Sequence, residues 1–98
     1  MSYLDKKAVR TQIEEAIGSK GRIRIVGTLA SSPKELYSRY ALGRKTGIRH
    51  SYLKSDLEKL VRLGWVEELN SLTKKYRLNT KHPQVEHILE FLKKVGYL

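Results

Sequence analysis

The segment "TGIRHSYLKSDLEKLVRLGW", residues 46–65, constrains the fold more than any other part of this chain. Its large apolar residues recur at helical spacing and form one continuous face: Leu53, Leu57, Leu60 and Val61. Gly64 stands where many helices end in a residue with a left-handed backbone. The pattern predicts an amphipathic helix over residues 50–63 whose leucine face must be covered by other elements.

Two further apolar stripes lie near the ends of the chain. The first contains Val9, Ile13, Ala16 and Ile17, and the second contains Val85, Ile88, Leu89, Leu92 and Val95. Both stripes have helical spacing, so they predict an N-terminal helix over 5–17 and a C-terminal helix over 83–95. Between them, the Ser-Ser-Pro sequence at 31–33 is typical of a helix start and predicts a helix over 34–46. Leu36, Tyr40 and Leu42 or Gly43 would lie on the buried face of that helix.

Two segments remain between these helices. The pattern of "RIRIVGTLA", residues 22–30, is compatible with a strand or a helix, because its isoleucines alternate with arginines but its apolar residues also fit helical spacing. Residues 65–79 contain two short β-prone runs, "WVEEL" and "KYRLN", and predict a hairpin. In its second strand Tyr76 and Leu78 would face inward, and Lys75 and Arg77 outward.

Composition indicates a folded protein rather than a disordered one. The 98 residues, of which 40% are hydrophobic and 31% charged, suit a single domain over 1–98. There is no cysteine, which excludes disulfides and cysteine-ligated metals. No apolar run approaches the roughly 20 residues that span a membrane, and the N-terminal sequence lacks the apolar core of a signal peptide. We therefore expect a cytoplasmic protein without a membrane partner.

Positive charge is concentrated in the middle of the chain. The whole sequence has 20 Lys and Arg against 10 Asp and Glu, a net charge of +10. Residues 20–62 contain 11 of these basic residues and three of the acidic ones, so most of the excess falls in this segment. A concentrated basic region is typical of proteins that bind nucleic acids. The alternative is a lysine-rich surface that only keeps the protein soluble.

In this order, the elements resemble the winged helix-turn-helix of prokaryotic transcriptional regulators of the broad ArsR/MarR type. The resemblance covers residues 21–79 and rests on "ALGRKTGI", "SYLKSDLEKLVRLGWV" and "KYRLN". These stand where the family has the end of the first motif helix and its turn, the recognition helix with the following Gly and Val, and the second wing strand.

The resemblance implies a mainly α fold of the α+β class, a winged helix-turn-helix with flanking N- and C-terminal helices. Residues 21–31 would form the first core helix, 34–46 and 50–63 the helix-turn-helix, and 65–79 a two-stranded wing. Two features depart from the family. The stretch from 33 to 47 is longer than usual, and the customary Ser or Asp before the recognition helix is replaced by Arg49 and His50.

The second departure has a physical meaning. A helix N-terminus has unpaired amide donors and a partial positive charge, so hydroxyl or acidic residues normally stand there. Arg49 and His50 make the local field more positive, which suits a helix end that binds an external phosphate. In the alternative interpretation Ser51 caps the helix and Arg49 simply points into water.

In a winged helix the first turns of the recognition helix enter the major groove. Helical geometry then places three residues where they would contact base edges: Ser51, Tyr52 and Ser55. Neighbouring residues would contact phosphates: Arg44, Lys45, Arg49, His50, Lys54 and Lys59. On the wing, Lys74, Lys75 and Arg77 would contact the DNA backbone or the minor groove, unless the two lysines only form a solvated loop tip.

Members of the family typically dimerise through their terminal helices, and both ends of this chain are nearly neutral. The predicted dimer interface contains Val9, Ile13, Ile17, Ile88, Leu92 and Val95. Two recognition helices would then address half-sites about one DNA turn apart. The alternative is that both stripes cover the core of the chain that carries them.

The expected function is sequence-specific binding of double-stranded DNA by a homodimer, as a nucleoid-associated transcriptional regulator. The alternatives are a weakly specific, architectural DNA-binding protein of the chromatin type and a winged-helix module for protein interactions. We expect no enzyme, because no nucleophile motif or phosphate-binding loop is present. No cofactor or small-molecule effector is expected either, and the three histidines, in three different elements, lack the spacing of a metal site.

Overall fold

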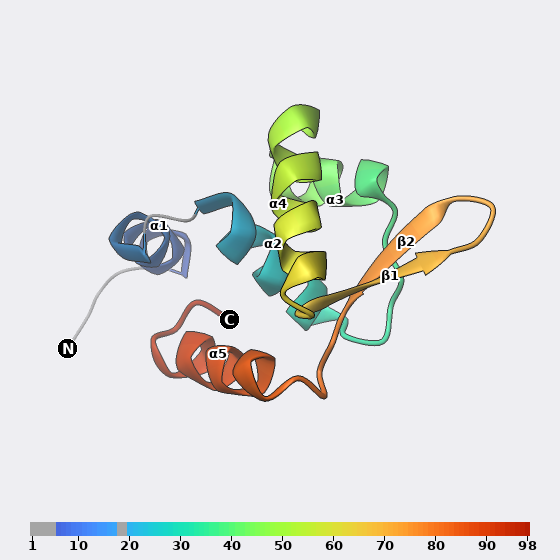
Figure 1. The fold of residues 1–98 in the computed structure, drawn as a ribbon. Helices are drawn as coiled ribbons and strands as arrows, with labels where there is room; N and C mark the ends of the chain where they lie inside the picture. The colour runs from blue at the N-terminus through green and yellow to red at the C-terminus, as the bar shows by residue number, and fades with distance from the viewer. Residues whose placement is uncertain (1–5, 18–19) are drawn as a thin grey trace.

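A computed structural model describes residues 6–17 and 20–98, without the side chains of residues 12, 13, 15 and 17. Within this part of the chain there are five helices and one two-stranded antiparallel sheet (Figure 1). The elements are α1 (Lys6–Ile17), α2 (Lys20–Ser31), α3 (Arg39–Thr46), α4 (His50–Arg62), β1 (Val66–Asn70), β2 (Lys74–Leu78) and α5 (Pro83–Lys94). The predicted α+β class with mostly helical content is confirmed.

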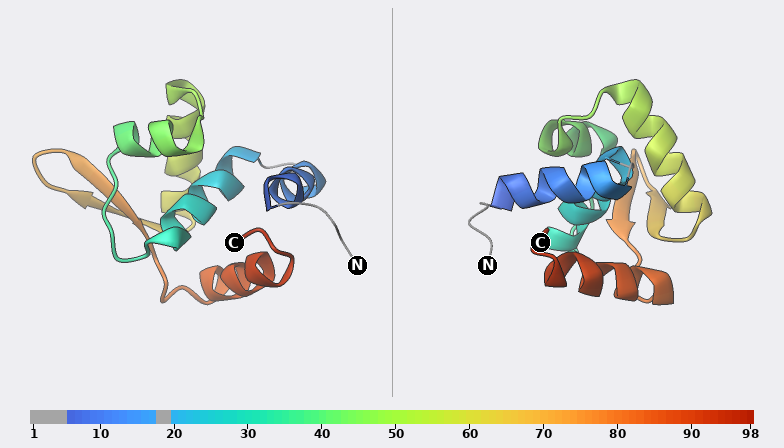
Figure 2. Two further views of the ribbon diagram at one scale, coloured as in Figure 1. Left: turned by 180° about the vertical axis from the view of Figure 1, so that it is seen from behind. Right: turned by 90° about the vertical axis from the view of Figure 1, so that its left-hand side faces the viewer.

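The ambiguous segment 22–30 belongs to helix α2, which lies at the centre of the molecule (Figures 1 and 2). Ile23 and Ile25 are both buried although two residues of a helix lie about 200° apart around its axis. Both sides of the helix must therefore be covered, and α2 contacts α1, α3, α4 and β2. A helix covered on two sides has no clean amphipathic pattern, which is why its sequence also resembles a strand.

Helices α2, α4 and α5 begin and end within one residue of the predicted positions. The prediction of a helix over 34–46 is wrong at its start, because α3 begins only at Arg39. Ser38 caps it, with its side-chain hydroxyl accepting a hydrogen bond from the Ala41 amide at 3.1 Å. The predicted cap at 31–33 does not exist, since Ser31 is the last residue of α2. Leu36 and Tyr40 are 42% and 73% exposed, so their predicted burial is also wrong.

Tyr37 explains why the segment before α3 is extended. Its amide donates to the carbonyl of Tyr76 and its carbonyl accepts from the amide of Tyr76, both at 2.8 Å. Both tyrosine side chains are buried, and burial raises the pKa of Tyr76. A helix through this segment would break both hydrogen bonds and remove Tyr37 from the core.

The predicted hairpin over 65–79 is confirmed, and Val66 pairs with Leu78 while Asn70 pairs with Lys74. As expected, Tyr76 and Leu78 are buried. The core lies between α2, α3, α4, α5 and the hairpin, and its fully buried side chains are Ile25, Val26, Leu29, Leu42, Leu53, Leu57, Leu60, Val66, Leu78, Val85 and Leu92. No helix in the described residues is both long and apolar enough to cross a membrane.

Helix α5 covers the core of its own chain. Leu92 is fully buried, so its assignment to a dimer interface is wrong, and Ile88 and Val95 are half-buried against the same core. After α5 the chain turns back and places the ring of Tyr97 on α2, where a Cβ atom at Gly27 would lie 2.8 Å from Cε1 of the ring. Val9 is half-buried beside this turn. The side chains of Ile13 and Ile17 lie outside the described part of the structure, and dimerisation itself stays a prediction.

Candidate nucleic-acid interface

Helices α3 and α4 are joined by a tight connection at residues 47–49. Gly47 ends α3 with φ 72°, a left-handed conformation that glycine adopts without a steric penalty, and its amide donates to the Gly43 carbonyl at 2.9 Å. The chain then turns directly into α4, whose Leu53 packs beside Gly43. The connection fixes the position of the α4 N-terminus relative to α3.

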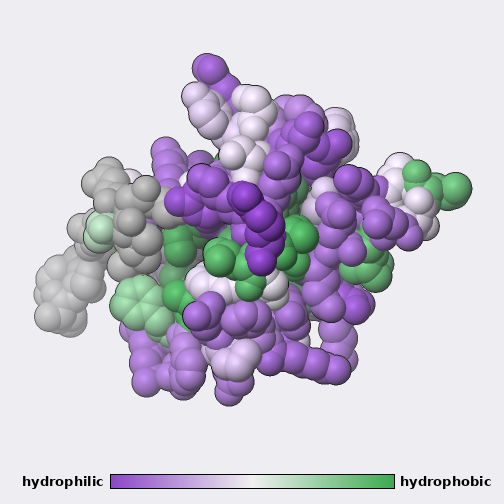
Figure 3. Space-filling view, viewed as in Figure 1, coloured by the Kyte–Doolittle hydropathy of each residue, from purple (hydrophilic) through white to green (hydrophobic). Residues whose placement is uncertain are grey.

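The two faces of α4 have opposite character. Leu53, Leu57 and Leu60 are buried, as their spacing predicts. The residues predicted to contact DNA from this helix and its entrance are all exposed: Arg49, His50, Ser51, Tyr52, Lys54, Ser55 and Lys59. Figure 3 shows a largely hydrophilic surface along α4 on this side of the molecule. The structure thus gathers these seven residues on and around one solvent-facing helix.

The start of α4 has no side-chain cap. Arg49 occupies the cap position with an extended backbone, φ −60° and ψ 144°, and its side chain makes no capping hydrogen bond. Ser51 is the second residue of the helix, so the interpretation in which it caps α4 is wrong. No acidic residue stands in the first turn of this helix. The partial positive charge of the helix end is therefore reinforced by Arg49 instead of being offset.

Ion pairs divide the charged residues of this region into two groups. Asp56 is half-buried and pairs with Arg22 of α2 at 3.2 Å, so its charge is largely balanced within the fold. Glu58 is the other acidic residue of α4 and is exposed. Within the described residues, no ion pair involves the cations of α4 and its flanks, which are Arg44, Arg49, Lys54, Lys59 and Arg62. A phosphate backbone could bind these cations without first displacing a carboxylate.

The hairpin is a weaker cationic surface than its sequence predicts. Arg77 pairs with Glu67 on the neighbouring strand at 3.0 Å, and Lys74 lies 4.0 Å from Glu68. Only Lys75 of the three predicted wing contacts has no ion pair among the described residues, and it is half-buried. The loop between β1 and β2 carries the fully exposed Leu72.

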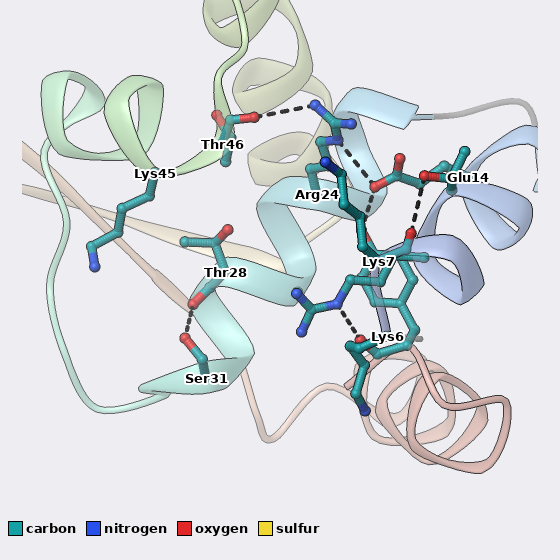
Figure 4. A pocket seen from close by; sticks show the side chains of 12 residues that line it. Lys6, Lys7, Glu14, Arg24, Thr28, Ser31, Lys45 and Thr46 are labelled. Atoms are coloured by element: carbon teal, nitrogen blue, oxygen red, sulfur yellow. Dashed lines mark hydrogen bonds and ion pairs between the residues drawn. The ribbon is translucent and has the colours of Figure 1, made fainter. Parts of the chain in front are cut away.

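Arg44 and Lys45 end α3 but face different surroundings. The Arg44 guanidinium lies 5.8 Å from the centre of the exposed Tyr40 ring, which is a cation–π contact. This contact was not predicted, because Tyr40 was expected to be buried. Lys45 lines a pocket between α1, α2 and the end of α3, together with residues from outside the predicted site (Figure 4). Lys45 therefore lies apart from the exposed residues of α4 with which it was predicted to bind DNA.

Sequence reasoning missed the α1 cations of this pocket, Lys6, Lys7 and Arg10, because residues 1–19 are neutral in total. A signal was present, since Lys7, Arg10 and Glu14 follow each other at helical spacing on one face of α1. For metal ions, the described residues contain no group of three His, Cys, Asp or Glu side chains arranged as a site. His82 instead caps α5, with its Nδ1 accepting from the Gln84 amide at 3.1 Å.

Comparisons of this chain with models of protein families, with curated proteins and with solved structures find no match. The resemblance to ArsR/MarR-type regulators therefore stays a prediction from the residues quoted above.

Proposed function

We propose that this protein is a winged helix-turn-helix protein that binds double-stranded DNA as a dimeric transcriptional regulator. Helix α3 and helix α4 form the helix-turn-helix, α4 lies in the major groove, and the β1–β2 hairpin is the wing. The observation that carries the proposal is the start of α4, where a helix end without a side-chain cap meets the exposed Arg49 and His50. Such an end offers main-chain amides and positive charge to one phosphate group.

The exposed face of α4 supports a division of roles. Ser51, Tyr52 and Ser55 project from its first turns, where side chains of a recognition helix reach base edges. Lys54 and Lys59 are exposed on the same helix, where they would contact phosphates on either side of the groove. Because Lys74 and Arg77 form ion pairs on the hairpin, the wing does not offer three free charges to DNA. It would instead position the protein through Lys75 and the exposed Leu72 at its tip.

The dimer in this proposal does not use Leu92, because that side chain is buried in the core of its own chain. On the outer surface of α5, Phe91 is 43% exposed and continues the half-buried Ile88. An interface through α1 and this surface leaves α4 free for DNA. Sedimentation at micromolar concentration tests it, and a monomer at all concentrations would remove the dimer from the proposal.

Selection of bound sequences from a random DNA pool tests the function directly. Enrichment of a palindrome with half-sites about one helical turn apart is expected for a dimer with two recognition helices. Recovery of DNA without any shared sequence would favour the architectural alternative. Recovery of no DNA above background would reject the proposal and favour a protein-interaction module.

Tyr52 provides the matched test of base reading. Replacing it with alanine is expected to cost about 1–3 kcal/mol on the selected sequence and much less on unrelated DNA, if its ring contacts a base edge or a thymine methyl group. Lys59→Gln is the control, because a phosphate contact weakens all sequences equally. An equal loss for Tyr52→Ala on every sequence would contradict its role in specificity.

A further inference from the structure

A second cationic surface lies away from the exposed face of α4. A pocket of about 780 Å³ is bounded by α1, α2, the end of α3 and Tyr97 (Figure 4). Its walls carry five cations, Lys6, Lys7, Arg10, Arg24 and Lys45, and a single carboxylate, Glu14. This volume falls within the range of about 300–1,000 Å³ typical of small-molecule sites.

The carboxylate is already satisfied within the fold. Glu14 is only 4% exposed, and its Oε2 accepts hydrogen bonds from Arg24 Nε at 3.0 Å and from the Tyr97 hydroxyl at 2.7 Å. Arg24 also donates to the Thr46 carbonyl at 3.3 Å, and Arg10 donates to the Tyr97 carbonyl at 2.6 Å. Both arginines and the glutamate thus serve the structure of the pocket wall.

Two lysines of the pocket differ from the two arginines in their contacts. Among the described residues, neither Lys7 nor Lys45 makes an ion pair with a carboxylate, although Lys45 lies 5.9 Å from the Tyr37 ring. Figure 4 shows Lys45 on one side of the pocket, Lys7 on the other, and Thr28 between them. Like charges placed around one concave surface repel each other, and an anion in the pocket relieves that repulsion.

We propose that this pocket binds a small molecule that carries phosphate groups. Lysine ammonium groups on separate walls suit the tetrahedral phosphate, which accepts hydrogen bonds from several directions. A planar carboxylate is recognised best by the paired donors of an arginine, and the Nε donor of both arginines here is already engaged by the protein. The hydroxyl group of Thr28 on α2 adds a polar partner to the same surface, whereas the Ser31 hydroxyl already donates to the Thr28 carbonyl at 2.6 Å. The volume leaves room for a ligand larger than the phosphate group itself.

Isothermal titration of the full chain with inorganic pyrophosphate tests this site without any DNA present. Saturable binding of one equivalent is expected, and the Lys7→Gln/Lys45→Gln variant should weaken it by about 10- to 100-fold through the loss of two charge-assisted contacts. The matched control is Lys81→Gln/Lys93→Gln, which removes the same charge from two exposed positions outside the pocket and should change the affinity by less than about twofold, because such charges are screened. Thermal unfolding of both variants verifies that they fold.

Three results would overturn the proposal. No saturable binding to the wild-type chain would show that the pocket is only a charged surface. An equal loss of affinity in both double variants would show general attraction to a basic protein. Citrate that binds as tightly as pyrophosphate would contradict the assignment to phosphate. None of these results bears on DNA binding, so the proposal fails or stands separately from the proposed function.

Discussion

Replacing Arg49 with serine should stabilise the protein and weaken its DNA binding at the same time. Arg49 already has the extended backbone of a cap residue, φ −60° and ψ 144°, so a serine needs no rearrangement to accept a hydrogen bond from the first turn of α4. A new cap contributes about 1 kcal/mol. Removing a cation from the positive end of the helix adds about 0.3–1 kcal/mol. We therefore expect the free energy of unfolding to rise by about 1–2 kcal/mol.

The same change removes the proposed phosphate contact at the helix start. Affinity should fall severalfold, and the slope of log K against log salt should become shallower by about 1.8, the value for two phosphate contacts, one from each chain of the dimer. Denaturant unfolding followed by the fluorescence of Trp65, the only tryptophan, measures stability. Fluorescence anisotropy with labelled DNA at several salt concentrations measures binding.

Arg49→Gln is the control, because it removes the charge without supplying a preferred cap residue. It should lose affinity as Arg49→Ser does but gain only about 0.3–1 kcal/mol of stability, which comes from removing the charge. Unchanged stability in Arg49→Ser would refute the argument about the missing cap. Increased stability with unchanged affinity and salt slope would show that Arg49 points into water and contacts no phosphate.

Three other predictions concern stability and charge. Leu92→Ala should lower the free energy of unfolding by about 2–5 kcal/mol, because Leu92 is buried within one chain. The loss should be the same at all protein concentrations. A loss that grows on dilution would instead place Leu92 in an interface. Stability should fall as pH rises above about 10, because burial and the Glu14 hydrogen bond raise the pKa of Tyr97 in the folded protein, so the unfolded chain loses the phenol proton first. Unfolding curves at alkaline pH should show a smaller fall for Tyr97→Phe. An identical fall would contradict the assignment to Tyr97. With four phosphate contacts from each chain of the dimer, eight in all, the salt slope should be about −7, so DNA affinity should drop roughly 10,000-fold between 50 and 200 mM salt. An affinity that hardly changes would refute the electrostatic argument. Those contacts are Arg44, Arg49, Lys54 and Lys59.

Local sequence patterns predicted an element correctly where only one of its faces is buried. The leucines of α4 have one buried side, and their spacing predicted the helix, its bounds and its exposed residues. Gly47 and Gly64 both have the positive φ that ends a segment, and both stand at predicted boundaries. The candidate interface on α4 follows from this pattern because its residues are neighbours on a single helix.

Long-range contacts account for the failures. Tyr37 is extended because of Tyr76, 39 residues later in the chain, and no local signal in the Ser-Ser-Pro sequence contains that partner. The stripe of α5 looks the same whether it covers its own core or a second chain, and only the turn that returns Tyr97 to Gly27 decides between them. The pocket proposed to bind phosphate joins α1, α2 and α3, so Arg24 and Lys45 become neighbours of the α1 charges only after folding.

The pair of hydrogen bonds between Tyr37 and Tyr76 also has a mechanical consequence. They hold the second strand of the hairpin on the side opposite β1, at a point near the core, whereas the loop that carries Leu72 extends into solvent (Figure 1). The hairpin is thus held at the middle pair of its ladder, Glu68 and Tyr76, and is free at its tip. Its base keeps a fixed direction relative to α4, and its tip can follow an uneven partner surface without disturbing the helices.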